Sequence, residues 1–363
     1  MNHPEAGGAE VHFHETFTRI AKMGHDVTLL CSHFSGAPKT EEIDGIHIIR
    51  HGGKFTFNLT VPSYYRKCLV DRDFDIIIED LNKIPFFLPL FIKDRPVLAL
   101  VHHLFGTAVY RETNPIFATY VYLTERSISY VYRSCPFEVV SESTRTELQE
   151  MGIPPGQIDV VHNGIDLDLF QTEPSLKKES VASIVYLGRL KRYKNVDRLI
   201  QAFVSVRNEV AGVRLTIVGE GDHRATLEAM VDKLGLSDVV TFTGFVSDQE
   251  KVSILTAAQV AAFPSDKEGW GLSVIEANVC NTPVVATRVP GLQDAVIHED
   301  TGILVPLGDT DALARELTRL LKDDTLRNKM AERSARRARE FTWDRTADRT
   351  IEILTTAVEN FRG

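Results

Sequence analysis

Residues 183–206, SIVYLGRLKRYKNVDRLIQAFVSV, contain the structural unit from which we predict the fold. The apolar run Ser183–Leu187 is typical of a strand that is buried on both faces of a parallel sheet. A short loop with one glycine and four basic side chains follows, and we expect a helix to begin near Asn195. A buried strand, a loop and a helix that returns over the sheet form the repeating unit of an α/β fold.

The same alternation runs through the chain of 363 residues, which is long enough for two domains. We predict two doubly wound, Rossmann-like α/β domains that face each other across a cleft. The polar residues 169–180 interrupt the pattern and separate an N-terminal domain, 1–168, from a C-terminal domain, 169–342. The expected strands are 26–31, 46–50, 75–79, 97–101, 137–141 and 158–162 in the first domain, and 183–187, 213–218, 239–243, 259–263, 283–286 and 302–305 in the second.

The N-terminal domain departs from this pattern at its start. A buried strand normally precedes the first glycine turn of such a domain, yet only the residues MNHPEA come before Gly7 and Gly8. These residues cannot form a buried strand, so we expect the domain to lack its first strand. We interpret this as a truncation.

The composition is that of a globular protein and excludes several classes of function. The chain is 43% hydrophobic and 25% charged, and its formal net charge of −9 disfavours binding to nucleic acid. Its four cysteines stand singly, which favours reduced thiols and a cytoplasmic location. No apolar run has the length of a membrane span, and no N-terminal stretch resembles a signal peptide.

Two basic side chains are candidates for a phosphate site. Ligands of open α/β sheets bind outside the carboxyl ends of the strands, and Arg189 and Lys194 follow the strand 183–187. A guanidinium and an ammonium beside the start of a helix are suited to a diphosphate. The alternative is a solvated loop of four basic residues, which the composition allows equally well.

Two glutamates follow the strand 259–263, with Glu268 in the loop and Glu276 about a turn into the next helix. A carboxylate can accept paired hydrogen bonds from the vicinal hydroxyls of a ribose or a hexose. The glycines between them, Gly269 and Gly271, let backbone amides approach a ligand. Ser273 and Glu276 also form a capping-box pattern, which would instead give Glu276 a structural role.

Histidines and glycines in the N-terminal half are weaker candidates. His102 and His103 directly follow the strand 97–101, where one imidazole could bond a sugar hydroxyl or a phosphate, or both could cap the strand. Gly7 and Gly8 open the first expected helix, which makes either an anion site or merely a tight turn. No cysteine or carboxylate stands at ligand spacing near the histidines, so we expect no metal site.

Together these residues resemble the family-four retaining glycosyltransferases of GT-B fold, which are nucleotide-sugar-dependent transferases of group 1. The resemblance covers nearly the whole chain, and its specificity lies in the order of the motifs. The motifs are Ala6-Gly-Gly-Ala-Glu10, His162-Asn-Gly-Ile-Asp166, Gly188-Arg189 with Lys194-Asn195, Phe263-Pro-Ser, Glu268 with Glu276, and Thr282-Pro-Val-Val. The missing opening strand, Asn281 in place of a usual glycine, and Asp294 in place of a common glutamate depart from the family pattern.

The resemblance implies that the C-terminal domain binds a nucleotide-diphospho-sugar, a UDP- or GDP-sugar, with no metal or other cofactor. Arg189 and Lys194 would contact the diphosphate, and Glu276 the ribose. Glu268 would bind the transferred sugar together with the backbone of four residues. These four are Gly269, Trp270, Gly271 and Leu272.

The remaining implied contacts come from both halves of the chain. The base would lie against the backbone around Val246, and Gly8 would approach the phosphates. His102, which matches the family histidine better than His103, would reach the sugar and the reacting face. The last helix, 343–363, would cross back onto the N-terminal domain.

The resemblance implies retaining transfer of a hexose-type sugar to an acceptor hydroxyl in glycan, glycolipid or cell-surface polysaccharide synthesis, with His102, Arg189, Lys194 and Glu268 as catalytic residues. A nucleotide-sugar 2-epimerase shares the architecture and is one alternative. A glycoside hydrolase with Glu268 and Glu276 as paired carboxylates is another. A non-catalytic sugar-nucleotide-binding protein is the third.

The acceptor half contains the apolar segment 84–92 and the aromatic-rich segment 115–133, which we expect to be a helix. Such stripes usually belong to the core. They would also suit a lipid-linked acceptor, so peripheral contact with the inner face of a membrane stays an alternative.

Overall fold

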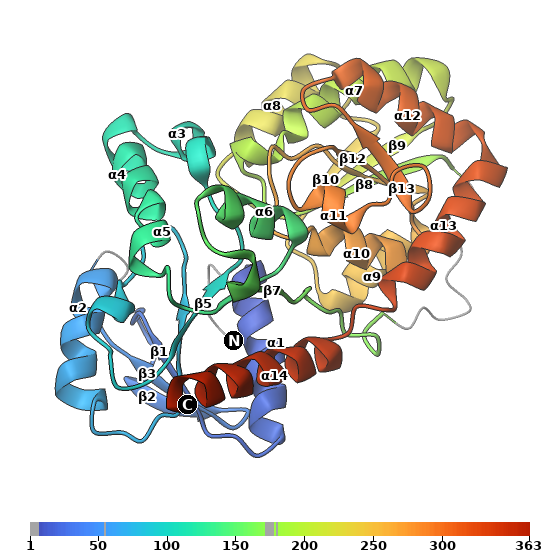
Figure 1. Cartoon of the computed structure of the whole chain (residues 1–363). Coiled ribbons are helices and arrows are strands. Elements are labelled where there is room, and N and C mark those ends of the chain that lie inside the picture. Colours follow the sequence, from blue (N-terminus) through green and yellow to red (C-terminus); the bar gives the residue numbers. More distant parts are fainter. Residues whose placement is uncertain (1–6, 54–55, 171–177, 179–180) are drawn as a thin grey trace. The chain divides into compact units, whose positions relative to one another are not determined.

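The computed structural model describes residues 7–53, 56–170, 178 and 181–363, which fold into two compact units (Figure 1). Unit 1 comprises residues 1–164 and 343–363, and unit 2 comprises residues 165–342. The sequence pattern predicts this boundary slightly later, at residue 168. Most of the expected linker, and the residues before Gly7 where a first strand was judged missing, lie outside the described residues.

Unit 2 is built on one parallel sheet in the order β10-β9-β8-β11-β12-β13. The strand order reverses between β8 and β11. In doubly wound sheets this switch point is where ligands bind, outside the carboxyl ends of the two strands. The strands are β8 (Ser183–Leu187), β9 (Arg214–Val218), β10 (Val240–Gly244), β11 (Val260–Phe263), β12 (Val284–Thr287) and β13 (Gly302–Val305), each close to a predicted range.

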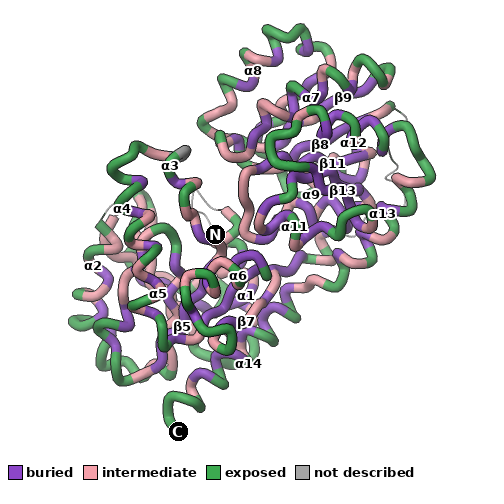
Figure 2. Tube along the Cα trace, turned by 45° about the horizontal axis from the view of Figure 1, so that its top comes forward, coloured by how far each residue is buried: buried purple, intermediate pink, exposed green. Residues whose placement is uncertain are grey.

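Helices cover both faces of this sheet and exclude water from it. Figure 2 shows the buried strands β8, β11 and β13 among the surrounding helices. Ile184 and Val185 of β8 and Val260 of β11 have no exposed surface, which is why these strands are continuously apolar. The helices are α7 (Val196–Glu209), α8 (Arg224–Lys233), α9 (Asp248–Ala257), α10 (Leu272–Val279), α11 (Leu292–Ala295), α12 (Thr310–Lys322) and α13 (Asp324–Ala338), with a single 3₁₀ turn η5 (Arg192–Lys194).

Unit 1 contains two sheets, a parallel one in the order β4-β5-β6-β7 and a second in the order β1-β3-β2. In the second sheet β2 runs antiparallel to β3. The sequence pattern does not predict β2, because its residues, TEEI, contain two charges and no apolar run. The strands are β1 (Val27–Cys31), β2 (Thr40–Ile43), β3 (Ile46–Arg50), β4 (Ile77–Asp80), β5 (Val97–Val101), β6 (Phe137–Val139) and β7 (Ile158–Val160).

The last helix of the chain, α14, belongs to unit 1. Its residues Ala347 and Leu354 share a hydrophobic core with Phe17 and Ile20 of α1, and the Thr346 hydroxyl donates to the carbonyl of His162 at 2.8 Å. The expected helix 115–133 is two helices with a break at Ser127. The helices are α1 (Gly8–Lys22), α2 (Phe57–Tyr64), α3 (Val109–Glu112), α4 (Pro115–Arg126), α5 (Ile128–Val131), α6 (Glu142–Glu150) and α14 (Trp343–Arg362), with the short turns η1 (Tyr65–Leu69), η2 (Leu88–Leu90), η3 (Gly106–Ala108) and η4 (Pro155–Gln157).

Candidate active site

The loops that follow β8 and β11 are joined at the switch point of unit 2. Asn195, which ends the β8 loop, has a left-handed backbone with φ of 52°. Its side-chain amide donates to the carbonyl of Pro264 at 3.0 Å and to Asp266 Oδ1 at 2.7 Å, both in the β11 loop. The backbone N–H of Asp266 donates in return to the carbonyl of Tyr193 at 2.7 Å. These bonds fix the two loops against each other.

Lys194 and Glu268, one from each loop, form an ion pair in which Lys194 Nζ donates to Glu268 Oε1. Their side chains are 13% and 18% exposed, so each keeps a small accessible surface. The Ser265 hydroxyl donates to the same oxygen at 2.7 Å. The structure therefore brings together two of the predicted site residues, 74 positions apart in sequence.

Arg189 lies in the same loop as Lys194 and shares a neighbour with it. Arg189 Nη2 donates to the Tyr193 hydroxyl at 3.4 Å, and Lys194 Nζ lies 5.2 Å from the centroid of the Tyr193 ring. Lys191, a further basic residue of this loop, is placed differently, because it bonds the exposed Asp222 at 2.7 Å. The loop is thus not uniformly solvated.

Close packing of glycines shapes the strand-end loops. A Cβ on Gly219 would lie 2.1 Å from the carbonyl oxygen of Gly188, and one on Gly291 would lie 2.3 Å from that of Glu268. Gly291 has φ of 82°, and the N–H of Glu268 donates to the carbonyl of Pro290 at 3.1 Å. These positions require glycine because the backbone of another loop occupies the space that a side chain would need.

The segment after Glu268 leads into helix α10. Gly271, with φ of 77°, is the N-cap, so the first amides of the helix, beginning at Leu272, lack acceptors within it. The Trp270 ring is 3% exposed and stands edge-on against Phe341 with centroids 5.0 Å apart. The Trp270 side chain therefore anchors the loop against the core of unit 2.

Glu276 lies on α10 and bonds Lys251 of α9, with 2.8 Å between Lys251 Nζ and Glu276 Oε1. The capping-box interpretation of Ser273 and Glu276 is wrong. Because Gly271 is the N-cap, Ser273 already lies inside the helix, and its hydroxyl cannot cap the helix. Glu276 is therefore anchored by tertiary contact. Val246, the predicted base contact, lies in the loop between β10 and α9 beside Phe245, which is 89% exposed.

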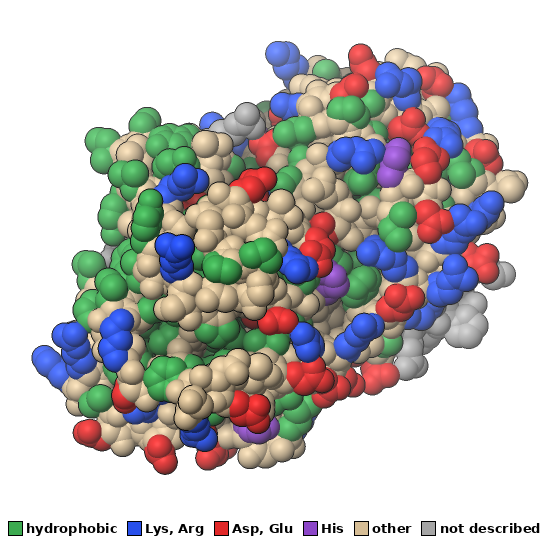
Figure 3. Space-filling view, in the orientation of Figure 1, with side chains coloured by type: hydrophobic (Ala, Val, Ile, Leu, Met, Phe, Trp, Pro, Cys, Tyr) green, Lys and Arg blue, Asp and Glu red, His purple; other side chains and the backbone are tan. Residues whose placement is uncertain are grey.

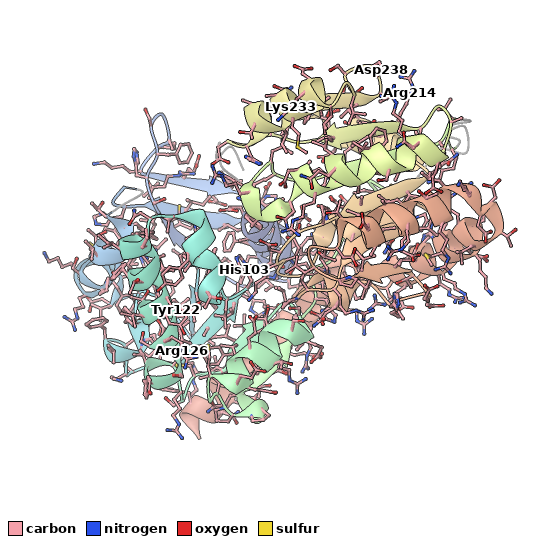
Figure 4. The ribbon with its side chains drawn as sticks, turned by 90° about the horizontal axis from the view of Figure 1, so that it is seen from above. His103, Tyr122, Arg126, Arg214, Lys233 and Asp238 are labelled. Carbon is pink, nitrogen blue, oxygen red and sulfur yellow. The ribbon has the colours of Figure 1, made fainter. Side chains whose placement is uncertain are left out.

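In unit 1 the predicted His102 lies in a polar cluster at the carboxyl ends of β4 and β5. His102 Nε2 is 3.7 Å from Asp80 Oδ2, and the His102 ring meets the His12 ring edge-on at 4.9 Å. His12 Nε2 is 4.0 Å from Glu138 Oε1. His103 instead packs against Phe105, with centroids 4.6 Å apart, and Figure 4 labels it.

Burial controls the protonation of this cluster. Desolvation, and to a lesser extent the charge of His102, lowers the pKa of His12 well below its usual range. Desolvation raises the pKa of Glu138 to about 7, against the hydrogen bond from Thr350, and it also raises the pKa of Asp80. His12, Asp80 and Glu138 are not among the residues predicted from the sequence. The available signal was a charged residue at the end of β4, another inside β6 and a histidine inside α1.

The N-terminus of α1 is open around the predicted Gly8. Gly7 is the N-cap, and its N–H donates to Glu10 Oε2 at 2.8 Å. A Cβ on Gly8 would have no described atom within 4 Å. The packing of the described chain therefore does not require glycine at this position.

Two negative findings apply to the described residues. They contain no group of three or more His, Cys, Asp or Glu side chains placed to hold a metal ion. Among the same residues, no helix combines the length and the apolar character that crossing a bilayer requires.

Comparison with known proteins agrees with this architecture. The sequence model of "Glycosyltransferase Family 4" matches residues 6–169, and that of "Glycosyl transferases group 1" matches residues 170–337. An uncharacterized glycosyltransferase of Methanocaldococcus jannaschii is 26% identical over 381 residues, which cover 97% of this chain and 95% of that protein.

Solved structures show the same fold at low sequence identity. Sucrose-phosphate synthase from Thermosynechococcus elongatus superposes with a TM-score of 0.82 at 22% identity and covers 97% of this chain and 94% of its own. HepE from Anabaena, in complex with UDP and glucose, gives 0.78 at 18% identity and covers 98% of both chains.

Two Rossmann-like units with parallel sheets define the GT-B class of glycosyltransferase structures, which confirms the predicted fold. Within that class, the chain belongs to the group 1 glycosyltransferases.

Proposed function

We propose that this chain is a retaining glycosyltransferase that moves a hexose-type sugar from a nucleotide-diphospho-sugar to an acceptor hydroxyl in glycan, glycolipid or cell-surface polysaccharide synthesis. The observation that carries the proposal is the pairing of Lys194 with Glu268 at the switch point of unit 2. An ammonium suits a diphosphate and a carboxylate suits sugar hydroxyls. Their contact supports a site in which a diphosphate and a sugar bind side by side at the carboxyl ends of β8 and β11.

Charge development explains what these residues would do. As the glycosidic bond breaks, negative charge grows on the leaving diphosphate, and fixed positive charges lower the barrier. Lys194 would move from Glu268 to a phosphate oxygen, with Arg189 as the second cation. Glu268, released from Lys194, would accept hydrogen bonds from the sugar. These cations neutralise the diphosphate, so the proposal includes no metal.

Retention would follow from attack on the face that the diphosphate leaves. The acceptor hydroxyl bonds to the anomeric carbon as the bond to the phosphate oxygen breaks, and its proton passes to that oxygen. The transition state resembles an oxocarbenium ion, as at other glycosidic centres. Gly8 and His102 belong to the proposal as donor contacts from unit 1, to the phosphates and the sugar respectively.

The donor is proposed to be a UDP- or GDP-sugar. HepE from Anabaena forms complexes with UDP and glucose and with UDP-glucose, which supports a uridine nucleotide. The test is incubation of the chain with UDP-, GDP- and ADP-sugars, with and without acceptor glycans. Nucleoside diphosphate released only with acceptor, and a product that keeps the anomeric configuration, is the expected result. Epimerised donor without release would identify a 2-epimerase, and inversion would exclude retention.

An exposed apolar surface on α4 and α5 supports a membrane-bound acceptor. Figure 3 shows hydrophobic side chains gathered over α3 and α4. Ile116 is 86% exposed, Leu123 61% and Tyr130 84%, with the exposed Arg126 and Arg133 beside them in sequence. Apolar side chains bordered by arginines are suited to an anionic lipid surface. We therefore include peripheral membrane contact in the proposal.

Removing apolar area from this surface gives a direct test. The double substitution Ile116→Ser with Leu123→Ser should lower sedimentation with phosphatidylglycerol vesicles by about fivefold or more, because binding scales with buried apolar area. Neutral phosphatidylcholine vesicles and the exposed-site control Leu234→Ser on unit 2 give the baseline. Equal sedimentation of all variants would contradict the membrane contact.

A further inference from the structure

Lys251 connects two parts of the expected donor site. It lies on α9, which follows the loop expected to contact the base, and it bonds Glu276, the carboxylate expected to bind ribose. Lys251 of α9 donates to Glu276 Oε1 on α10 at 2.8 Å and to Asp248 Oδ1 on its own helix at 3.1 Å. Lys251 Nζ also lies 5.3 Å from the centroid of the Phe170 ring. The lysine side chain is 18% exposed, so it is largely withdrawn from solvent.

The two oxygens of the Glu276 carboxylate have different surroundings. Oε1 is held by Lys251. Among the described residues, Oε2 accepts no hydrogen bond, although the side chain keeps 13% of its surface exposed. A carboxylate has acceptor capacity on both oxygens. One oxygen is therefore anchored while the other is available to a ligand hydroxyl.

Anchoring changes what the carboxylate can do. A glutamate has three side-chain torsions, so immobilising it on a ligand costs rotamer entropy. Because Lys251 already holds Glu276 before the ligand arrives, less of this entropy is lost on binding. A diphosphate bound nearby would also repel an ionised carboxylate. A neighbouring ammonium opposes that repulsion. The two carboxylates likewise stabilise the ammonium, and they raise the pKa of Lys251 against its desolvation.

We propose that Lys251 is a positioning residue, which orients Glu276 Oε2 toward the ribose hydroxyls of the donor nucleotide. It does not contact the reacting atoms. The inference rests on the proposed function, because it needs a nucleotide donor. Its specific consequence is that discrimination between ribose and deoxyribose depends on Lys251.

The experiment measures affinities of the full-length chain for UDP, GDP and ADP and for their 2′-deoxy forms by calorimetric titration. For the nucleotide that binds, the wild type should bind the ribose form about tenfold or more tightly than the deoxyribose form. This is the change in affinity expected for one hydrogen bond to a charged group. Lys251→Met should reduce this preference to about threefold or less. Lys251→Arg, which keeps a donor cation, should retain most of it.

A purely structural role of Lys251 would give a different result. It would weaken ribose and deoxyribose forms equally and leave their ratio unchanged. The matched control is Lys322→Met, because Lys322 also bonds a glutamate, Glu209, at 2.8 Å, but between α12 and α7. Glu276→Gln should remove the preference, and Lys251→Met in that background should change nothing further. If Lys251→Met does not fold, Lys251→Gln takes its place with the same two readings.

The outcomes separate this inference from the proposed function. Nucleotide binding with an unchanged ribose preference in Lys251→Met would overturn the role of Lys251 alone. No binding of any nucleoside diphosphate by the wild type would overturn both.

Discussion

The two units differ in the partners that they give to some of their least exposed carboxylates. Unit 2 places opposite charges in contact near the carboxyl ends of its strands, as in the pairs Lys194–Glu268 and Lys251–Glu276. Unit 1 buries carboxylates against neutral donors. Glu79 accepts from the N–H of Phe86 at 2.5 Å and from the Tyr132 hydroxyl at 2.7 Å. Glu138 accepts from the Thr350 hydroxyl at 3.0 Å.

This difference separates charged side chains that can bind a ligand from charged side chains that stabilise the fold. An ion pair with a small exposed surface can exchange partners with a charged ligand, because the ligand replaces the interaction that each partner loses. A carboxylate buried under hydroxyl and amide donors has no such exchange available. Its desolvation instead raises its pKa, to about 7 for both Glu79 and Glu138. We therefore expect substitutions in unit 2 to affect turnover, and substitutions of the carboxylates in unit 1 to affect stability.

The largest expected effect is on turnover when the unit 2 pair is broken. Lys194→Ala should lower kcat by about 100-fold or more, the cost of removing one preorganised group that stabilises transition-state charge. The measurement is steady-state release of nucleoside diphosphate, with thermal unfolding to check the fold. Lys191→Ala, in the same loop but paired with exposed Asp222, is the control and should keep wild-type turnover. Equal losses in both variants would contradict a specific role for Lys194.

Loop alignment should matter less than the charges themselves. Asn195→Gly keeps the left-handed backbone but removes the bonds to Pro264 and Asp266, so kcat should fall by about tenfold. Asn281→Gly is the matched control, because Asn281 has a similar φ of 56° at the end of α10. If both variants turn over like the wild type, the side-chain bridge of Asn195 does not position the site.

Unit 1 should respond to pH through Glu138. The carboxyl pKa rises from 4.5 to about 7 on folding, so the folded state favours the protonated form. Its contribution to stability is present below pH 4.5 and is lost as pH rises toward 7. The loss is roughly 3 kcal/mol, from the size of the shift.

Glu138→Gln removes this titration and retains an oxygen for Thr350. The free energy of unfolding of the variant, relative to wild type, should therefore increase between pH 4.5 and 7 and be constant above it. Denaturant titrations at several pH values measure this difference. The exposed Glu142→Gln should show no such trend. A constant difference across the range would show that Glu138 does not titrate with folding.

The last expected effect is at Gly8, where stability and turnover should respond differently. Because a Cβ there meets no described atom, Gly8→Ala should leave the melting temperature nearly unchanged. If the donor phosphates approach this backbone, the methyl group should lower kcat/KM by about tenfold. Gly156→Ala, equally unobstructed in η4, is the control. Unchanged kcat/KM in Gly8→Ala would remove Gly8 from the donor site.

The order of strands in unit 2 explains why two candidate residues that are distant in sequence meet in the structure. Residues after β8 and β11 meet because these strands are neighbours at the switch point. Reading the segments after each apolar run therefore found both Lys194 and Glu268. Figure 4 labels Arg214, Lys233 and Asp238, which lie toward the other end of the strands, since Arg214 is the first residue of β9. No site was predicted there.

The local sequence was misleading where the same residue spacing fits both a helix cap and a tertiary contact. Ser273 and Glu276 have the spacing of a capping box, but Gly271 starts the helix and Glu276 bonds Lys251. Lys251 itself gave no signal, because an i, i+3 pair with Asp248 is ordinary on a helix surface. Its bond to Glu276 spans 25 positions and follows only from the packing of α9 beside α10.

The sequence by itself determined the alternation of strands and helices, the class of fold and the charged residues at the strand ends. These follow from apolar periodicity and from glycine positions, which are local properties of the chain. The tertiary structure decided which of those charges pair, which histidine of 102 and 103 meets Asp80, and how His12 and Glu138 come to share one buried cluster. Such contacts join residues far apart in sequence, and burial, which sets their pKa values, exists only after the sheets and helices have packed.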